Sequence, residues 1–145
     1  MARHFVDTSA LVKLYRNESL TAAVEACVAP NDTLVIGGIA CLEFQSAFYG
    51  LVRQNLIAQS HAQQRISLLR QDLPNFVVIS LTQALVASAE VLIDRFGVSE
   101  GLRPGDALHL ACALEAHGQA PLDSVLTTDA ILSRCMLSVG LVVKP

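Results

Sequence analysis

Several features that define whole classes of protein are scarce or missing in this sequence of 145 residues. Charged residues make up only 16% of it and hydrophobic residues 52%, a balance that excludes a disordered chain. No stretch reaches the roughly 20 apolar residues needed to cross a bilayer, because even the longest uncharged run, residues 73–89, is interrupted by Pro74 and other polar or turn-forming residues. The N-terminus also lacks a signal peptide's long apolar region. We therefore expect a cytoplasmic protein with no membrane segment.

A disulfide framework is also missing. The four cysteines form no CxxC pair, and each lies in an apolar, helix-like stretch: Cys27, Cys41, Cys112 and Cys135. This pattern is typical of small buried hydrophobic residues in a reducing compartment.

An excess of basic residues, common in nucleic-acid-binding proteins, is absent too. The net charge is -3, from 10 Lys and Arg against 13 Asp and Glu. If four of the acids gather in one pocket, nine acidic residues remain against ten basic ones, and the surface outside that pocket is about neutral. A bound cation would offset the pocket itself. The composition therefore permits a nucleic-acid substrate without demanding one.

What the sequence does contain is a regular alternation of short apolar runs and longer helical patterns. Continuous apolar runs are typical of strands covered on both faces, so the alternation predicts an α/β domain with a parallel sheet between two layers of helices. The breaks between these elements are too short for interdomain linkers, so we expect residues 1–145 to form a single domain. The predicted strands are residues 4–6, 34–36, 76–79, 124–126 and 139–142, and the predicted helices are residues 9–15, 20–29, 39–55, 60–71, 81–96, 106–117 and 130–135.

Two acidic residues directly follow predicted strands. Asp7 comes after the first strand, and Asp129 follows the fourth after Thr127 and Thr128. In parallel sheets, ligands bind beyond the carboxyl ends of the strands, where the connecting loops begin helices. We therefore expect these two carboxylates, far apart in the sequence, to lie at the same edge of the sheet.

Three of the acids also have a purely structural interpretation. Asp7 and Asp129 precede predicted helices, where an aspartate side chain accepts hydrogen bonds from free backbone amides. Asp106 follows Pro104 and Gly105, and an acid in a first helical turn complements the helix dipole. Glu43 differs, because it falls inside the predicted helix 39–55, on a face of small side chains. A carboxylate there indicates a cavity or close approach to another element, although a solvent-exposed Glu is an open alternative.

Together, Asp7, Glu43, Asp106 and Asp129 fit a metal site better than four unrelated caps. Mg²⁺ and Mn²⁺ prefer carboxylate oxygens and activate water as a nucleophile, whereas converging carboxylates repel one another without a cation. The predicted reaction is cleavage of a phosphodiester bond by a metal-activated water. Thr8, Ser9 and Thr127 are candidate supporting hydroxyls or simply caps, and Lys13, Arg16 and Arg103 are candidate contacts to substrate phosphates or simply solvated charges.

These residues resemble the PIN-domain ribonucleases, especially the VapC-like toxins of toxin-antitoxin pairs. The resemblance rests on Val6-Asp7-Thr8-Ser9-Ala10, Glu43, the run Asp106-Ala-Leu-His-Leu-Ala111 and Thr127-Thr-Asp129, which span almost the whole chain. It implies a three-layer α/β/α sandwich with a five-stranded parallel sheet, an endoribonuclease that depends on Mg²⁺ or Mn²⁺, a homodimer, and inhibition by a cognate antitoxin. The family's acidic positions fall on Asp7, Glu43, Asp106 and Asp129, and RNA as the substrate comes from the resemblance alone.

Two other functions compete with this one. A phosphatase with Asp7 as covalent nucleophile should carry a second Asp two residues later, where Ser9 stands. A catalytically silent PIN-like RNA-binding module would not need all four acids.

A zinc site at Asp106, His109 and Cys112 lacks a further ligand, and His109 is better explained by packing beside the pocket or orienting a neighbour.

Overall fold

The computed structural model describes all residues 1–145 and is built around one parallel sheet. Its strands are β1 (Arg3–Val6), β2 (Thr33–Gly37), β3 (Val77–Ile79), β4 (Ser124–Leu126) and β5 (Val143–Lys144). They lie in the order β3-β2-β1-β4-β5, and every neighbouring pair is parallel. The three central strands end in fully buried residues, because helices cover both faces.

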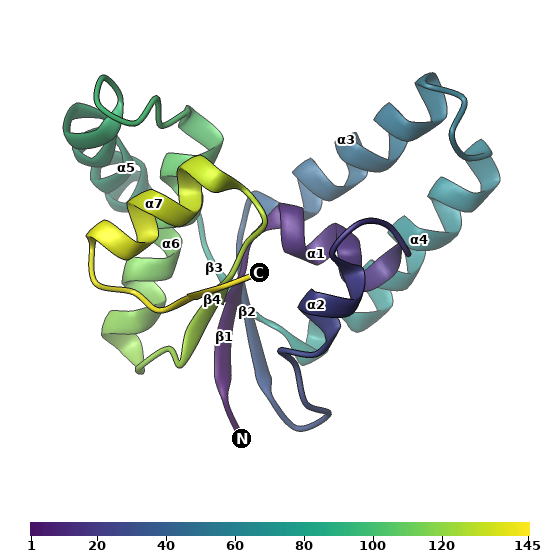
Figure 1. Ribbon diagram of the computed structural model, residues 1–145, viewed down its shortest axis with the longest axis horizontal. Helices are drawn as coiled ribbons and strands as arrows, with labels where there is room; N and C mark the ends of the chain where they lie inside the picture. The colour runs from purple at the N-terminus through teal and green to yellow at the C-terminus, as the bar shows by residue number, and fades with distance from the viewer.

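Helices form one layer on each side of this sheet (Figure 1). One layer contains α1 (Thr8–Tyr15), α2 (Thr21–Glu25), α3 (Ala40–Arg53) and α4 (Gln59–Asp72), and the other contains α5 (Gln83–Phe96), α6 (Pro104–Gln119) and α7 (Ala130–Ser138). A short 3₁₀ turn, η1 (Leu73–Asn75), leads from α4 into β3. The predicted three-layer α/β/α sandwich with a five-stranded parallel sheet is confirmed.

Each helical layer packs its own apolar core against one sheet face. Phe44 and Phe48 of α3 lie 4.7 Å apart, ring centre to ring centre, in the core beneath α1 to α4. On the other face, α6 contributes an almost unbroken buried stripe that includes Leu110 and Cys112. All four cysteines are free, but Cys27 and Cys41 are only partly buried. No helix combines the length and apolarity that a membrane-spanning segment needs.

The last predicted strand, 139–142, was wrong. Helix α7 runs on to Ser138, and Gly140 adopts a left-handed conformation with φ of 88°. The amide of Gly140 donates to the carbonyl of Leu137, and that of Leu141 donates to Met136, which is the Schellman arrangement that ends many helices. The apolar residues after α7 therefore close a helix, and the strand starts only at Val143.

Helix α3 begins at Ala40, one residue later than predicted. Strand β2 extends to Gly37, and the Gly38 amide still donates to the carbonyl of Ile79 at 2.8 Å. A Cβ on Gly38 would lie 3.1 Å from that carbonyl oxygen, so a side chain at residue 38 would crowd this approach and glycine leaves room for it. Since α3 starts at Ala40, Glu43 lies in its first turn and not in its middle.

At the opposite edge of the sheet, where the strands begin, Asp32 predicts how the stability of the fold depends on pH. Its carboxylate accepts hydrogen bonds from the amides of Ala29 and Ala2, both at 2.7 Å, and these bonds lower its pKa from 3.8 to about 2. A folded-state pKa below the unfolded value means that the stabilisation is present above about pH 4 and is lost as the pH falls towards 2. As the pH falls through this range, we expect the free energy of unfolding to decrease less in Asp32→Asn than in the wild type.

Urea unfolding at pH 6 and at pH 2.5 measures this difference. Asp94→Asn is the matched control, because Asp94 is exposed and makes no side-chain hydrogen bond. An equal acid-induced loss in the Asp32 variant and the wild type would contradict the assignment.

Candidate metal and nuclease site

Four helices begin at the carboxyl edge of the sheet, and each carries an acid at its start. Asp7 is the N-cap of α1 and Asp129 the N-cap of α7, while Glu43 and Asp106 lie in the first turns of α3 and α6. The positive end of a helix dipole stabilises a carboxylate in each of these positions. Asp7 and Asp129 are thus helix caps, as the structural interpretation predicted. The same two residues also lie at one edge of the sheet, so capping does not exclude a shared site.

Asp7 is the most buried of the four, with 3% of its surface exposed. It accepts hydrogen bonds from the Ser9 amide, from the Ser9 hydroxyl at 3.2 Å and from the Thr127 hydroxyl. Burial raises the pKa of Asp7, and the charge of His109 together with these hydrogen bonds only partly opposes that effect. An ionised Asp7 is therefore short of positive charge in this structure.

Ser9 and Thr127 tie the ends of β1 and β4 together around Asp7. The Ser9 hydroxyl also accepts from the Thr128 amide at 2.9 Å, and the Thr127 hydroxyl accepts from the Asp129 amide at 3.1 Å. Strands β1 and β4 are direct neighbours, which explains why residues about 120 positions apart meet here. Asp7 and Asp129 are thereby held to the same small network.

Glu43 lies in a second network with Thr8 and His109. The Thr8 hydroxyl donates to Glu43 Oε1 at 2.8 Å, and His109 Nε2 contacts the same oxygen. Burial raises the pKa of Glu43, but the hydrogen bonds from His109 and Thr8 and the charge of His109 outweigh burial, and the pKa lies below its usual value. For His109, burial lowers the pKa, and Glu43, Asp7 and Asp106 together raise it above the usual value.

Arg103 bridges the two remaining acids. Its Nε donates to Asp106 Oδ2 and its Nη2 to Asp129 Oδ2, each at 3.0 Å. Burial raises the pKa of Asp106, the hydrogen bond from Arg103 lowers it and the charge of Asp129 raises it, with a net upward shift. The Arg103 guanidinium is therefore the one cation that the Asp106 and Asp129 carboxylates share.

The other two basic candidates make a different contact. Lys13 Nζ lies 2.8 Å from Glu18, and Arg16 pairs with the same carboxylate. The two cations share a single carboxylate, so the three side chains together keep a net positive charge that favours a phosphate.

The donor set fits a hard divalent cation, with all four side chains offering carboxylate oxygens. The Arg103 guanidinium between Asp106 and Asp129 marks a position that favours positive charge. As the side chains stand, no three His, Cys, Asp or Glu residues are grouped closely enough to form a metal site. Binding an ion would therefore require Arg103 to move and the carboxylates to close around the ion.

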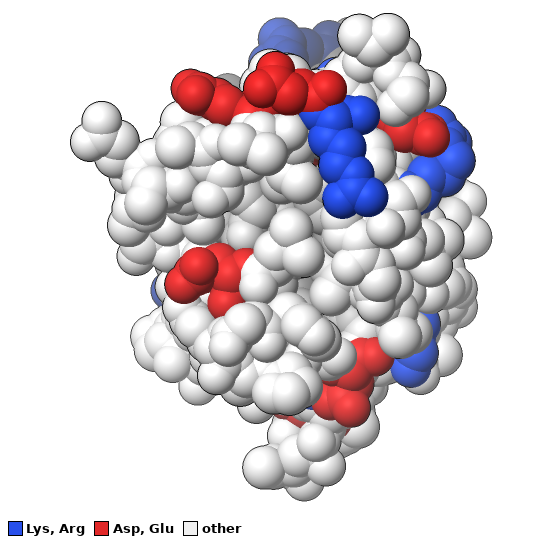
Figure 2. All heavy atoms as spheres, turned by 90° about the vertical axis from the view of Figure 1, so that its left-hand side faces the viewer, with Lys and Arg blue, Asp and Glu red and all other residues white.

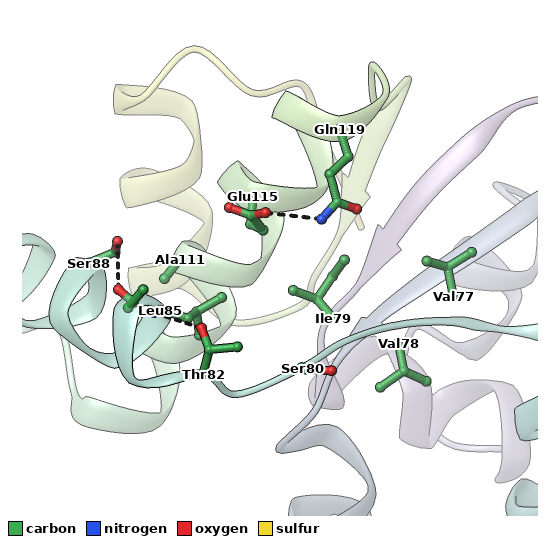
Figure 3. Close-up of a pocket in the computed structure, with 11 residues that line it drawn as sticks. Val77, Val78, Ile79, Ser80, Thr82, Leu85, Ser88, Ala111, Glu115 and Gln119 are labelled. Carbon is green, nitrogen blue, oxygen red and sulfur yellow. Dashed lines mark hydrogen bonds between the residues drawn. The ribbon is translucent and has the colours of Figure 1, made fainter.

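Surface hollows help to separate this site from other candidates. A hollow of about 340 Å³ includes Thr127, Thr128 and Asp129 in its lining. A separate groove of about 370 Å³ lies between the exposed edge strand β3 and helices α5 and α6 (Figure 3). Its only carboxylate, Glu115, accepts a hydrogen bond from Gln119 at 3.0 Å, so this groove lacks the acids that metal chemistry needs.

Charge is sparse on the face covered by α5 to α7 (Figure 2). Acidic and basic groups lie side by side along the upper edge of this view, and much of the remaining surface is uncharged. This face therefore offers no broad basic surface for a nucleic acid.

The structure adds two residues whose contacts the sequence did not reveal. His109 was expected to pack beside the pocket or to orient a neighbour, and it contacts Glu43 directly. Its position three residues after Asp106, on the same helical face, was the available signal. The bridging position of Arg103 had no such signal, because Asp129 is 26 residues away and reaches it only through the fold.

The comparisons with known proteins agree with this architecture. The PIN domain family model matches residues 4–135, whereas no curated protein sequence matches the chain. The fold is similar to that of VapC20 from Mycobacterium tuberculosis, a toxin that cleaves the sarcin-ricin loop, with a TM-score of 0.68 and 19% identity over 98% of this chain and 99% of that one.

Two complexes contain similar chains. One is VapBC2 from Rickettsia felis bound to a promoter DNA fragment, with a TM-score of 0.64, 16% identity, and coverage of 97% of this chain and 96% of that one. The other is a toxin-antitoxin complex from Klebsiella pneumoniae, with a TM-score of 0.57, 16% identity, and coverage of 94% and 92%. At these identities the structures establish the shared fold, and the family model covers most of the sequence. The chain therefore belongs to the PIN domain family.

Proposed function

We propose that this chain is a metal-dependent endoribonuclease and the toxin of a toxin-antitoxin pair. The observation that carries the proposal is the convergence of four acid-bearing helix starts at the carboxyl edge of the sheet, with Arg103 bridging two of the acids. Ligands bind at this edge in parallel α/β sheets.

Asp7, Asp106 and Asp129 would hold Mg²⁺ or Mn²⁺ most closely, with Glu43 binding directly or through water. When bound, such an ion lowers the pKa of water and stabilises charge on the attacking and leaving oxygens of a phosphodiester. Ser9 and Thr127 hold the Asp7 carboxylate in place through their hydroxyls, and the Thr8 hydroxyl does the same for Glu43. Lys13, Arg16 and Arg103 are the proposed contacts to substrate phosphates.

RNA as substrate and an antitoxin as partner are supported by the similar proteins. VapC20 is a toxin that cleaves the sarcin-ricin loop, and the Klebsiella pneumoniae chain belongs to a toxin-antitoxin complex. We further propose a homodimer, because Val78 of β3 and Val91 of α5 leave 45% and 66% of their surfaces exposed. Light scattering of the purified protein measures the dimer, and co-purification with the product of the adjacent gene measures the antitoxin complex.

The decisive experiment incubates the purified protein with end-labelled RNA and with DNA of the same sequence, in EDTA, Mg²⁺ and Mn²⁺. We expect internal cleavage of the RNA that requires the metal. Glu25→Gln is the matched control for variants of the acids, because Glu25 is exposed and makes no side-chain hydrogen bond. Cleavage that persists in EDTA would overturn the metal mechanism, and preferential cleavage of DNA would overturn RNA as substrate.

Replacing Arg103 is expected to change metal affinity and RNA binding in opposite directions. Arg103→Gln removes the guanidinium that competes with a metal ion for Asp106 and Asp129, so we expect tighter Mn²⁺ binding. Arg103 is 65% exposed and each of its two exposed ion pairs contributes about 0.2–1 kcal/mol, so the gain should be about two- to thirtyfold. The same variant should raise KM for RNA if Arg103 contacts phosphate.

Calorimetric titration with Mn²⁺ measures the first effect, and cleavage at saturating metal measures the second. Arg95→Gln serves as a control, because Arg95 lies over the Phe96 ring and pairs with none of the four acids. Weaker Mn²⁺ binding by the Arg103 variant would contradict the competition.

A further inference from the structure

Side chains from two other helices hold one oxygen of Glu43. Thr8 of α1 donates to Glu43 Oε1 at 2.8 Å, and Nε2 of His109 on α6 contacts the same oxygen. Thr8 Oγ1 and His109 Nε2 also lie 3.1 Å apart, so the three groups form a closed triangle. Glu43 itself keeps 34% of its side chain exposed, whereas His109 keeps 2%. The buried His109 and the partly buried Thr8 thus hold a carboxylate that reaches the surface.

The positions of the hydrogens in this triangle follow from simple counting. An ionised carboxylate only accepts hydrogen bonds, and a threonine hydroxyl has a single hydrogen to donate. The Thr8 hydrogen is used on Glu43, so Thr8 can only accept from His109. His109 Nε2 therefore carries a hydrogen that faces both oxygens, and this bonding fixes the orientation of the ring.

The rest of the fold holds the imidazole firmly. Phe5 of β1 packs against the ring edge to face, with ring centres 6.3 Å apart and an angle of 69°. A Cβ added to Gly37 would lie 3.4 Å from His109 Nδ1, in ordinary van der Waals contact, so the Gly37 backbone also lies beside the ring.

His109 Nδ1 is buried and has no hydrogen-bond partner. An unpaired buried nitrogen is unfavourable, and an apolar side chain would avoid it if the position served packing alone. The Nε2 contact with Glu43 is what an apolar side chain could not supply. The unpaired nitrogen therefore argues that the ring serves Glu43.

The second oxygen of Glu43 lies against the start of α6. A Cβ added to Gly105 would come to 3.1 Å from Glu43 Oε2, so this oxygen lies beside the residue before Asp106, in space that a side chain there would crowd. With Oε1 held by Thr8 and His109, Oε2 is directed to the helix start that carries Asp106.

We propose that Thr8 and His109 are positioning residues that hold Glu43 Oε1 and present Oε2 to a divalent cation shared with Asp106. This inference rests on the proposed metal-dependent function. Thr8 and His109 would then act as residues that hydrogen-bond to a metal ligand and orient it. The loss of such a residue typically costs 10- to 100-fold in metal affinity or activity.

The test measures Mn²⁺ binding to the full chain by calorimetry and by electron paramagnetic resonance, which need no cleavage activity. We expect Thr8→Val and His109→Leu each to weaken Mn²⁺ binding about 10- to 100-fold. Thr8→Ser and His109→Gln restore a hydrogen-bonding atom and should recover most of the lost affinity. With RNA, kcat at limiting Mn²⁺ should fall and high Mn²⁺ should restore it, while KM for RNA stays the same.

A double-variant cycle separates positioning from a general effect on the fold. In a Glu43→Gln background, Thr8→Val should weaken Mn²⁺ binding no further, because the carboxylate that Thr8 orients is gone. Thr8→Val keeps the size and shape of the side chain at the partly exposed first residue of α1, so it remains a test even if His109→Leu does not fold.

The possible failures are distinct. If the wild type binds Mn²⁺ and cleaves RNA but Thr8→Val binds Mn²⁺ equally well, the positioning role is wrong and the proposed function stands. Additive losses in the Glu43→Gln background would also overturn positioning. If the wild type neither binds Mn²⁺ nor cleaves RNA, the proposed function and the positioning role fail together.

Discussion

Replacing Asp7 with asparagine is expected to abolish RNA cleavage and to make the metal-free protein more stable. The loss of cleavage should exceed the roughly 10- to 100-fold effect of removing an outer-shell partner, because Asp7 is proposed to bind the ion itself. Most inactivating substitutions of buried residues also destabilise the fold. The opposite changes in activity and stability at Asp7 are therefore a sharp test.

The gain in stability follows from the environment of Asp7. Burial raises its pKa above 3.8, so the folded state binds this proton more tightly than the unfolded state. Stability then falls as the pH rises from about 4 through the higher folded pKa, and the protein carries this cost at neutral pH. Asparagine has no such charge, and it can still accept from the Ser9 amide as an N-cap.

Thermal unfolding in EDTA at pH 7.5 and at pH 4.5 measures the effect. Asp7→Asn should unfold at a higher temperature than the wild type at pH 7.5, and the difference should shrink at pH 4.5. Glu25→Gln, on the exposed face of α2, should change neither the unfolding temperature nor cleavage. A variant that cleaves RNA at the wild-type rate would remove Asp7 from the mechanism, and a lower unfolding temperature would contradict the account of its charge.

Adding Mn²⁺ should stabilise the wild type by an amount set by the affinity of the site. An ion that binds only the folded state at 100 times its Kd contributes about 2.7 kcal/mol. For a domain of this size, each kcal/mol raises the unfolding temperature by about 2–4 °C, so a shift of about 5–10 °C is expected.

Asp129→Asn should lose most of this shift without unfolding. Asparagine is as good an N-cap as aspartate and can accept from the Leu132 amide, where Asp129 Oδ1 now lies at 2.8 Å. It removes the charge proposed to bind the ion. Asp94→Asn, an exposed acid on α5, should keep the full shift. If Mn²⁺ stabilises Asp129→Asn as much as the wild type, Asp129 does not bind the ion.

The sequence alone determined the architecture well because hydrophobic patterning is a local property. Continuous apolar runs marked β1, β2, β3 and β4 to within one residue at either end, since strands covered on both faces need apolar side chains throughout. The prediction of β5 failed because Val139 and Leu141 are as apolar as strand residues. These two residues complete the end of α7 around Gly140. Apolarity alone does not distinguish a helix end from a strand.

The sequence also placed Asp7 and Asp129 at one edge, because carboxyl ends of parallel strands lie together whatever their separation along the chain. It placed Glu43 in the interior of its helix, whereas α3 begins one residue later than predicted and Glu43 lies in the first turn, because apolar periodicity does not fix a helix boundary to the residue. Only the tertiary structure decided that Arg103 joins Asp106 to Asp129 and that Thr8 and His109 share one oxygen of Glu43. Those contacts join side chains from different helices, and their distances depend on how the helices pack on the sheet.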